Sequence, residues 1–442
     1  YFQLYPALGK QVGESATVYT NMPSAGAMRG YGIPQVAFAM ECQMDELAHR
    51  LGLDLVEVRR RNMLRAGDRT ITGQVMLESR GLGLEKCLDR VLERMEWSSR
   101  PVALGTGPIR RGRGLGLFLY GTGVPMLFEG ASCFATLQLD GTLNINVGST
   151  EMGQGLTTAL AQIASELLGI PLDDVLVDIS DTALAPDSGP TVGSRSVVLV
   201  GNAVTDACAR LRERLLDTAA RYFFQTDVRN LEIGGGRIFE SGKPERSRTF
   251  AEVVLKAFNT QVPLSVVGSW YPPQATFRAE DGQGNPCHAY SFGAHGVEVE
   301  VDVETGSVSV TRSVLACDVG KAINPVNVEG QMEGGAAQAI GWSVMEESIL
   351  ERGVMKNAAF HNYLIPTSRD LPLLESIIVE HPNELGPFGA KGVGEPPIVG
   401  GAPAIRNAVR DALGFPINAI PLTARQVLLA MRTREQCQGG ER

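Results

Sequence analysis

Residues 389–397 read GAKGVGEPP, and this stretch is the most informative part of the chain. Glu395 follows a glycine and precedes two prolines, so its backbone is constrained while no bulky neighbour in sequence covers its side chain. A carboxylate held in this way can act as a general base. The alternative interpretation is an exposed loop glutamate that has no part in chemistry.

Four earlier segments combine glycines with hydrogen-bonding side chains. They are AMRGYG at 27–32, GSTEMGQG at 148–155, GSRS at 193–196 and GQMEGG at 330–335. The segments at 148–155 and 330–335 are expected at helix N-termini, where free backbone N–H groups and the helix dipole favour an anion. Any one segment could instead serve only turns or close helix packing. Five of them together favour a ligand-binding role.

Hydrophobic periodicity predicts helices and β-hairpins in alternation. Hairpins are expected at 133–147 and 296–316, around Asp-Gly and Thr-Gly turns. The three arginines at 59–61 are expected on a solvated helix face, and the Gly-, Pro- and Arg-rich stretch at 98–113 is expected to be a domain boundary. Helices are predicted at 40–51, 54–61, 84–95, 156–168, 203–222, near 250, and at 328–345, 402–413 and 423–431.

Composition excludes several classes of function. The 442 residues carry a net charge of −9 without a basic run, which argues against nucleic acid as a partner. No apolar stretch approaches the roughly 20 residues of a membrane span. The seven cysteines are scattered without a C-x-x-C pair, which predicts a reducing, cytoplasmic location and no protein-held iron–sulfur cluster. A metal is therefore expected only within a cofactor. The start at Tyr1 indicates a processed chain or a piece of a longer one.

In their order and spacing, the motifs AMRGYGxPQ, TEMGQG, GSRS, GQMEGG and KGVGEPP resemble those of the molybdenum hydroxylases, the xanthine dehydrogenase/aldehyde oxidase family. The chain resembles the C-terminal half of the molybdopterin-binding subunit. This resemblance implies an α+β fold of intertwined molybdopterin-binding domains. Residues 1–100 would be the C-terminal part of the first domain, and residues 107–442 the second.

The resemblance also implies roles for particular residues. Glu395 matches the catalytic glutamate, and Tyr31 and Arg29 match residues of the substrate pocket. The molybdenum would be held by molybdopterin and by no protein side chain. The residues that match cofactor-binding positions are Arg29, Met152, Gly153, Gln154, Gly193, Ser194, Arg195, Ser196 and Gln331.

The implied activity is hydroxylation of a purine or related N-heterocycle with oxygen from water, as in xanthine or hypoxanthine dehydrogenases. Aldehyde, carbon monoxide or aryl-CoA substrates are alternatives within the family. Gly123 and Val124 stand where purine oxidisers have an aromatic residue and threonine, so the sequence does not support a purine sandwich. Outside the enzymes, the alternatives are a non-catalytic assembly subunit and a phosphate-binding module.

The implied cofactor is molybdopterin, either as such or in its cytosine dinucleotide form. [2Fe-2S] clusters and FAD are expected on other domains or subunits. The expected partners are the N-terminal half of the molybdenum subunit, the iron–sulfur and FAD components, and a small-molecule heterocycle or aldehyde as substrate. The whole is expected to be an oligomer.

Overall fold

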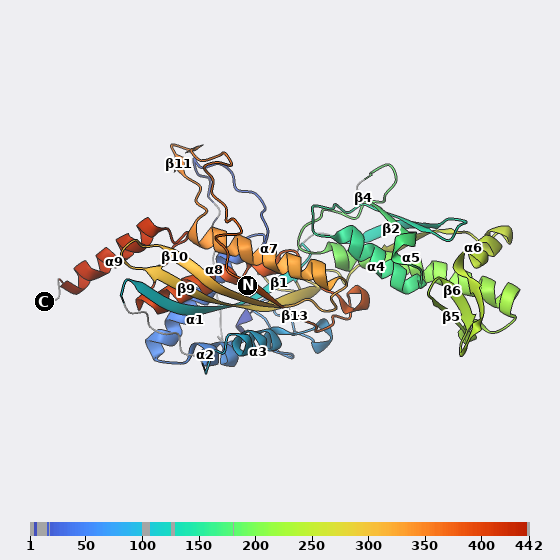
Figure 1. The fold of residues 1–442 in the computed structure, drawn as a ribbon, viewed down its shortest axis with the longest axis horizontal. Helices are drawn as coiled ribbons and strands as arrows, with labels where there is room; N and C mark the ends of the chain where they lie inside the picture. The colour runs from blue at the N-terminus through green and yellow to red at the C-terminus, as the bar shows by residue number, and fades with distance from the viewer. Residues whose placement is uncertain are drawn as a thin grey trace.

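The computed structural model describes residues 4–6, 16, 18–99, 107–124, 129–179 and 181–439. They form an elongated molecule with a larger and a smaller lobe (Figure 1). The α-helices are α1 (Ile33–Leu51), α2 (Leu55–Asn62), α3 (Leu84–Arg94), α4 (Leu156–Leu168), α5 (Ser196–Ala219), α6 (Phe250–Asn259), α7 (Pro325–Val344), α8 (Gly401–Leu413) and α9 (Ala424–Gly439). The strands are β1 (Ile109–Thr122), β2 (Ala131–Leu137), β3 (Leu143–Val147), β4 (Val175–Ile179), β5 (Leu231–Gly234), β6 (Arg237–Glu240), β7 (Lys243–Thr249), β8 (Ser265–Trp270), β9 (Ala289–Asp302), β10 (Val308–Asp318), β11 (Leu350–Glu351), β12 (Val354–Met355) and β13 (Leu374–Val379).

The larger lobe is built on a sheet with the strand order β1-β9-β10-β13. β9 pairs antiparallel with both β1 and β10, and β13 pairs parallel with β10. Helices α7 and α8 lie on one side of this sheet, and α2 and α3 on the other (Figure 1). Apolar side chains of the first three helices share one buried core with β1, β9 and β10.

Helix α8 lies unusually close to strand β1. A Cβ atom on Gly112, Gly114 or Gly116 would come within 2.5 Å of a backbone oxygen at the start of or within α8. These alternate glycines therefore leave a flat surface on β1 against which α8 packs, and this explains some of the 51 glycines of the chain. This strand was not predicted, because glycine, which recurs along it, disfavours strand structure. Residues 100–106 of the expected boundary stretch 98–113 lie outside the described residues, and the stretch ends inside β1, so the two-domain division stays a prediction.

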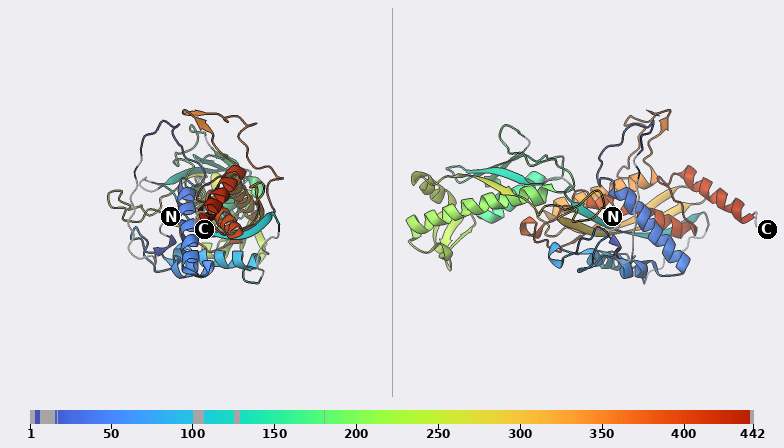
Figure 2. Two further views of the ribbon diagram at one scale, coloured as in Figure 1. Left: turned by 90° about the vertical axis from the view of Figure 1, so that its left-hand side faces the viewer. Right: turned by 180° about the vertical axis from the view of Figure 1, so that it is seen from behind.

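The smaller lobe repeats the arrangement of the larger one. Its sheet has the order β4-β3-β2-β8, with β2 and β3 antiparallel and β3 and β4 parallel. Each lobe thus contains a hairpin, then a helix, then a strand parallel to the second hairpin strand. Helices α4 and α5 cover one face of the small sheet, and the view from behind shows α5 running along it (Figure 2, right). Strands β5–β7 and α6 lie at the far end.

The predicted hairpins and helices are confirmed in kind, and the fold is α+β, but several helix bounds differ: α1 begins at Ile33 and not at residue 40, and α9 extends to Gly439. Helix α5 begins at Ser196, earlier than predicted, so the GSRS segment leads directly into it. Helix α7 begins at Pro325 after the Asn324 cap, so residues 330–335 lie inside the helix. The expected helix N-terminus at this segment is wrong. No helix in the described ranges is long and apolar enough to cross a membrane.

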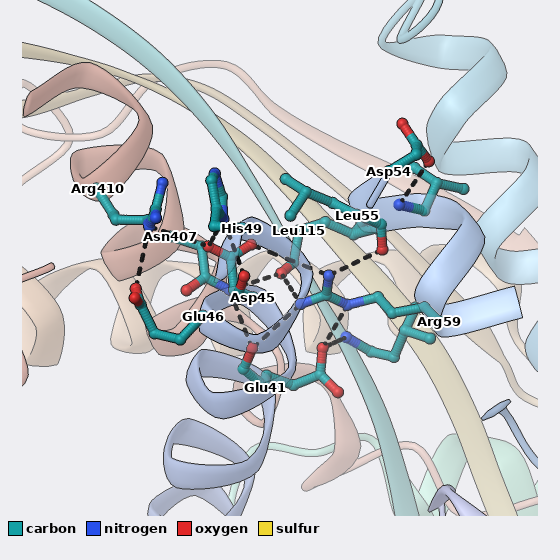
Figure 3. A network of polar contacts seen from close by, with 12 residues as sticks. Glu41, Asp45, Glu46, His49, Asp54, Leu55, Arg59, Leu115, Asn407 and Arg410 are labelled. Atoms are coloured by element: carbon teal, nitrogen blue, oxygen red, sulfur yellow. Dashed lines mark hydrogen bonds and ion pairs between the residues drawn. The ribbon is translucent and has the colours of Figure 1, made fainter. Parts of the chain in front are cut away.

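A buried polar network ties α1 and α2 to β1 (Figure 3). The Arg59 Nε atom lies 2.9 Å from Glu41 Oε2, and both side chains are fully buried. The Leu117 N–H donates to the same carboxylate oxygen at 3.1 Å. Burial opposes the positive charge of Arg59, but the charges of Glu41, Tyr5 and Asp45 together outweigh it and raise the pKa of Arg59. The prediction that Arg59 is solvated is therefore wrong, whereas Arg61 is exposed.

Candidate active site

All five glycine-rich segments meet at one cavity of about 570 Å³ between the lobes. The smaller lobe contributes the segments at 148–155 and 193–196, and the larger lobe contributes the other three. Gly193 lies beside this cavity, where its carbonyl accepts the N–H of Gly123 at 2.9 Å. The predicted site residues that line the cavity are Arg29, Tyr31, Met152, Gly153, Gln154, Ser194, Arg195, Ser196, Gln331 and Glu395.

Glu395 is held in the wall of the cavity by the start of α5. The Ser194 hydroxyl donates to Glu395 Oε2 at 2.9 Å and accepts the Glu395 backbone N–H at 3.0 Å. The Gly30 N–H lies 3.4 Å from Oε1. The Glu395 side chain is half-buried, and it is oriented by Ser194 of the smaller lobe and by Gly30 of the larger lobe. The interpretation of Glu395 as a freely exposed loop residue is therefore wrong.

The contact between the third and fifth segments requires glycine at position 392. A Cβ atom there would lie 2.0 Å from the Ser194 carbonyl oxygen. The Ser291 hydroxyl also donates to the Gly392 carbonyl at 2.6 Å. Ser194 itself adopts a left-handed backbone conformation with φ 51°, which is uncommon for residues other than glycine. Strain of this kind is found where the surrounding structure over-determines a functional loop.

A buried ion pair fixes the root of the loop that carries Glu395. The side chains of Lys391 and Asp318 contact each other and are fully buried. Lys391 Nζ also donates to the Gly81 carbonyl at 2.8 Å, and Asp318 accepts the Gly83 N–H at 3.0 Å. Breaking a buried pair leaves an uncompensated charge, so this loop cannot move without a large cost in free energy.

Arg29 joins three of the segments. Its Nε donates to the Gly394 carbonyl at 2.6 Å, its Nη1 to Gln338 Oε1 at 3.0 Å, and its Nη2 to the Gln331 carbonyl at 2.8 Å. Burial lowers the pKa of Arg29, and the charge of Glu395 acts in the opposite direction. These acceptors are neutral, so the positive charge of the guanidinium is available to the cavity. Tyr31 stands at the cavity rim and is 60% exposed.

The 148–155 segment differs from expectation. The Glu151 carboxylate accepts the N–H groups of Gly153 and Gly155, both at 2.9 Å, and of Thr157 at 3.2 Å. Burial alone would raise the pKa of Glu151, but these backbone hydrogen bonds lower it overall. The protein's own carboxylate therefore occupies the N-terminus of α4, and the expected free anion site there is wrong. Gln154 closes the same loop by donating to the Thr150 carbonyl at 2.8 Å.

The guanidinium of Arg195 holds a neighbouring loop. It donates to the carbonyls of Ser188 at 3.0 Å and Pro190 at 2.8 Å, and its Nε lies 3.0 Å from Glu129 Oε1. Arg195 is 5% exposed, so little of its charge reaches the cavity. Its effect on a ligand is therefore indirect, because it fixes the backbone at the start of α5.

Sequence reasoning missed two amides on the cavity side of α7. Asn327 and Gln338 line the cavity together with Gln331. Their spacing of four and seven residues from Gln331 places all three on one helical face, and this periodicity could have found them. Among the residues that the structure describes, no group of three or more His, Cys, Asp or Glu side chains could hold a metal.

The sequence matches the molybdopterin cofactor-binding domain over residues 90–372, and a second domain of the same description over residues 8–63. The chain belongs to the molybdopterin cofactor-binding family of the molybdenum hydroxylases. The resemblance seen in the five motifs is thereby confirmed, and with it molybdopterin as the cofactor that this family binds. Most of the cavity lining falls within the matched residues.

Relatives of this molybdopterin-binding chain include enzymes of different names. The putative xanthine dehydrogenase molybdenum-binding subunit XdhA of Escherichia coli K12 is 36% identical over 93% of this chain and 54% of its own length. Aldehyde oxidoreductase of Megalodesulfovibrio gigas is 33% identical over 95% of this chain and 43% of its own length. This chain therefore spans about half the length of the curated relatives that it matches.

A solved structure shows the same fold. Quinoline 2-oxidoreductase from Pseudomonas putida 86 is 27% identical to this molybdopterin-binding chain and superimposes with a TM-score of 0.82. The match covers 92% of this chain and 53% of that one. The sequence match and the structural match thus indicate the same family. The names of these relatives refer to different substrates.

Proposed function

We propose that this chain forms part of a molybdenum hydroxylase that oxidises a purine or related N-heterocycle, with Glu395 as the general base. The observation that carries the proposal is the half-buried carboxylate of Glu395 in the wall of a cavity built from all five motifs. A scaffold without chemistry needs no such residue, whose carboxylate accepts the Ser194 hydroxyl and whose backbone N–H donates to the same hydroxyl.

The chemistry of the cavity lining suits a molybdopterin. A pterin needs donors and acceptors along its edge, and Gln331, Gln338 and Asn327 supply both from one face of α7. The glycine backbone at 153 and 394 allows close approach to a flat ligand. Gly193 and Arg195 would act by shaping the loop that begins α5. The positive charge of Arg29 suits an anionic group.

When bound, molybdopterin supplies the two-electron redox chemistry, and the protein provides orientation and a base. Glu395 takes up a proton from the water-derived nucleophile. The proton is expected on Oε1, because Oε2 accepts the Ser194 hydroxyl at 2.9 Å whereas the Gly30 N–H lies 3.4 Å from Oε1. Arg29 and Tyr31, which both line the cavity, orient the substrate. The buried Lys391–Asp318 ion pair holds the Glu395 loop in a fixed position relative to Arg29 and Tyr31.

The other components of the enzyme are proposed from the family. The chain spans about half the length of its relatives, so the N-terminal half of the molybdenum subunit is the proposed partner that completes the cavity. [2Fe-2S] clusters and FAD on further domains or subunits would carry the electrons away. Aldehydes are the second candidate substrate class, because aldehyde oxidoreductase is among the relatives.

A side-by-side oxidation assay tests the substrate class. The complete, molybdenum-loaded enzyme is assayed with purines, nicotinate and aldehydes, in water enriched in oxygen-18. We expect the highest kcat/KM for an N-heterocycle and label from water in its product. A preference for aldehydes would move the substrate to the second candidate class, and product oxygen that comes from dioxygen would contradict the proposed reaction.

A further inference from the structure

Two segments that are far apart in the sequence project together from the larger lobe. They are residues 18–28, which lead into the first glycine-rich segment, and residues 346–366, which contain β11 and β12. We call these two segments together the arm. It stands out beside the label of β11 in Figure 1 and is seen again from behind in Figure 2. A Cβ atom on Gly353 would lie 2.9 Å from the Asn21 carbonyl oxygen, so the two segments are in contact.

The arm exposes apolar side chains and has no apolar core of its own. Every residue from 18 to 28 is exposed, and within the fully described segment 346–366 only Asn357 is buried. No apolar side chain of these two described segments belongs to a buried apolar cluster. The large apolar side chains that are half or more exposed are Val18, Tyr19, Met22, Met28, Ile349, Val354, Phe360, Leu364 and Ile365. Exposed apolar patches mark interaction surfaces, and aromatic residues and methionine are enriched at the centres of interfaces.

Polar contacts give the second segment of the arm a defined shape. The Asn357 side chain accepts the Ile349 N–H at 2.9 Å and donates to the Glu347 carbonyl at 2.7 Å. The Tyr363 hydroxyl donates to Glu346 Oε2 at 2.9 Å. Strands β11 and β12 pair antiparallel. A surface that is shaped before binding loses less conformational entropy on docking than a disordered segment does.

The base of the arm reaches the cavity that contains Glu395. Met28, the last residue of the first arm segment, lines the cavity and is 52% exposed. Helix α7, which carries Gln331 and Gln338 in the cavity wall, ends at Val344, shortly before the second arm segment begins. A partner that covers the arm therefore lies next to the cavity.

We propose that the arm is the docking surface for the N-terminal half of the molybdenum subunit. The inference rests on the proposed partnership of this chain with that half. The match covers 54% of the Escherichia coli relative and 53% of the quinoline 2-oxidoreductase chain, so each has nearly as much chain outside the match as within it. A partner of that size, which completes the cavity, has to contact this chain beside the cavity. The arm is the apolar surface at that place.

Photo-crosslinking in the complete, purified enzyme tests the identity of the partner. Phe360→p-benzoylphenylalanine places a photoreactive ring at a position of the arm that is 104% exposed in this chain. We expect peptide mass spectrometry to find its cross-links in the N-terminal half of the subunit. The matched control is Phe258→p-benzoylphenylalanine, because Phe258 is 54% exposed on α6 at the far end of the smaller lobe and is expected to give no such cross-link. Cross-links from position 360 to a second copy of this chain or to another component, or none at all, would overturn the proposal.

A pair of substitutions tests whether the contact matters for the cofactor site. Phe360→Ser in the complete enzyme weakens the docking surface without removing a core residue of this chain. We expect the molybdenum content of the purified enzyme to fall several-fold, because docking completes the cavity. Phe258→Ser is expected to leave the molybdenum content unchanged. An unchanged content in Phe360→Ser, or an equal loss in both variants, would contradict the proposed role of the arm.

The cross-linking result does not depend on turnover, so the inference and the proposed function fail separately. If position 360 is cross-linked to the N-terminal half in an enzyme that oxidises aldehydes only, the arm is confirmed and the proposed substrate class is wrong. If the enzyme oxidises N-heterocycles and position 360 is cross-linked elsewhere, only the role of the arm is wrong.

Discussion

Glu395→Gln is expected to lower kcat of the molybdenum-loaded enzyme by about 100- to 10,000-fold, the range that a general base contributes. Glutamine has the same shape and can still contact the Ser194 hydroxyl and the Gly30 N–H, so the loop and the cofactor should be retained. It cannot take up a proton from a nucleophile. The effect should therefore appear in kcat, with molybdenum content unchanged.

Glu304→Gln is the control for this substitution. Glu304 is an exposed residue in the turn of the β9–β10 hairpin, and the same chemical change there is expected to leave kcat unaltered. Steady-state kinetics and metal analysis on the same preparations make the comparison. A Glu395→Gln enzyme with full cofactor loading and near-wild-type kcat would remove Glu395 from the mechanism.

Arg59→Met is expected to destabilise the larger lobe by about 3–5 kcal/mol, because it leaves the Glu41 carboxylate buried without its partner (Figure 3). The substitution also removes a link between α2 and β1, because Arg59 donates to the Leu115 carbonyl at 3.4 Å. Scanning calorimetry of the complete enzyme should show a lower Tm for the transition of this lobe, by roughly 6 °C or more.

Two comparisons isolate the cause. Arg61→Met removes an exposed arginine from the same helix, and its effect is expected to stay within about 0.5 kcal/mol. The double substitution Glu41→Leu with Arg59→Met removes both charges, so it should recover part of the lost stability. Equal losses in Arg59→Met and Arg61→Met would show that the buried pair does not stabilise the lobe.

The meeting of the five segments at one site could be predicted from sequence, because each segment is recognised from residues that are adjacent in the chain. Each glycine-rich segment marks a close backbone approach, and each carries a side chain such as Arg29 or Gln331 that can recognise a ligand. The structure brings these segments to one cavity. Hydrophobic periodicity likewise indicated α4 and α8, whose apolar faces repeat at helical spacing.

The errors have a common physical cause, which is that they depend on contacts distant in sequence. Arg59, Arg60 and Arg61 are consecutive, yet successive helical residues point in different directions, and only Arg59 meets Glu41 in the core. The Glu151 carboxylate occupies the N-terminus of α4 only because the loop that carries it folds back toward the helix. The hydrogen bond between Ser194 and Glu395 joins residues 201 positions apart, so no local pattern could reveal it.

The molybdenum content of the purified assembly tests the central claim most directly. The complete subunit is produced in a host with an intact molybdopterin pathway, and metal and pterin are measured on the same sample. The account predicts molybdenum and pterin in equal amounts, both stoichiometric with this chain. A folded assembly that contains neither would contradict a cofactor site between the lobes and would favour the non-catalytic assembly role.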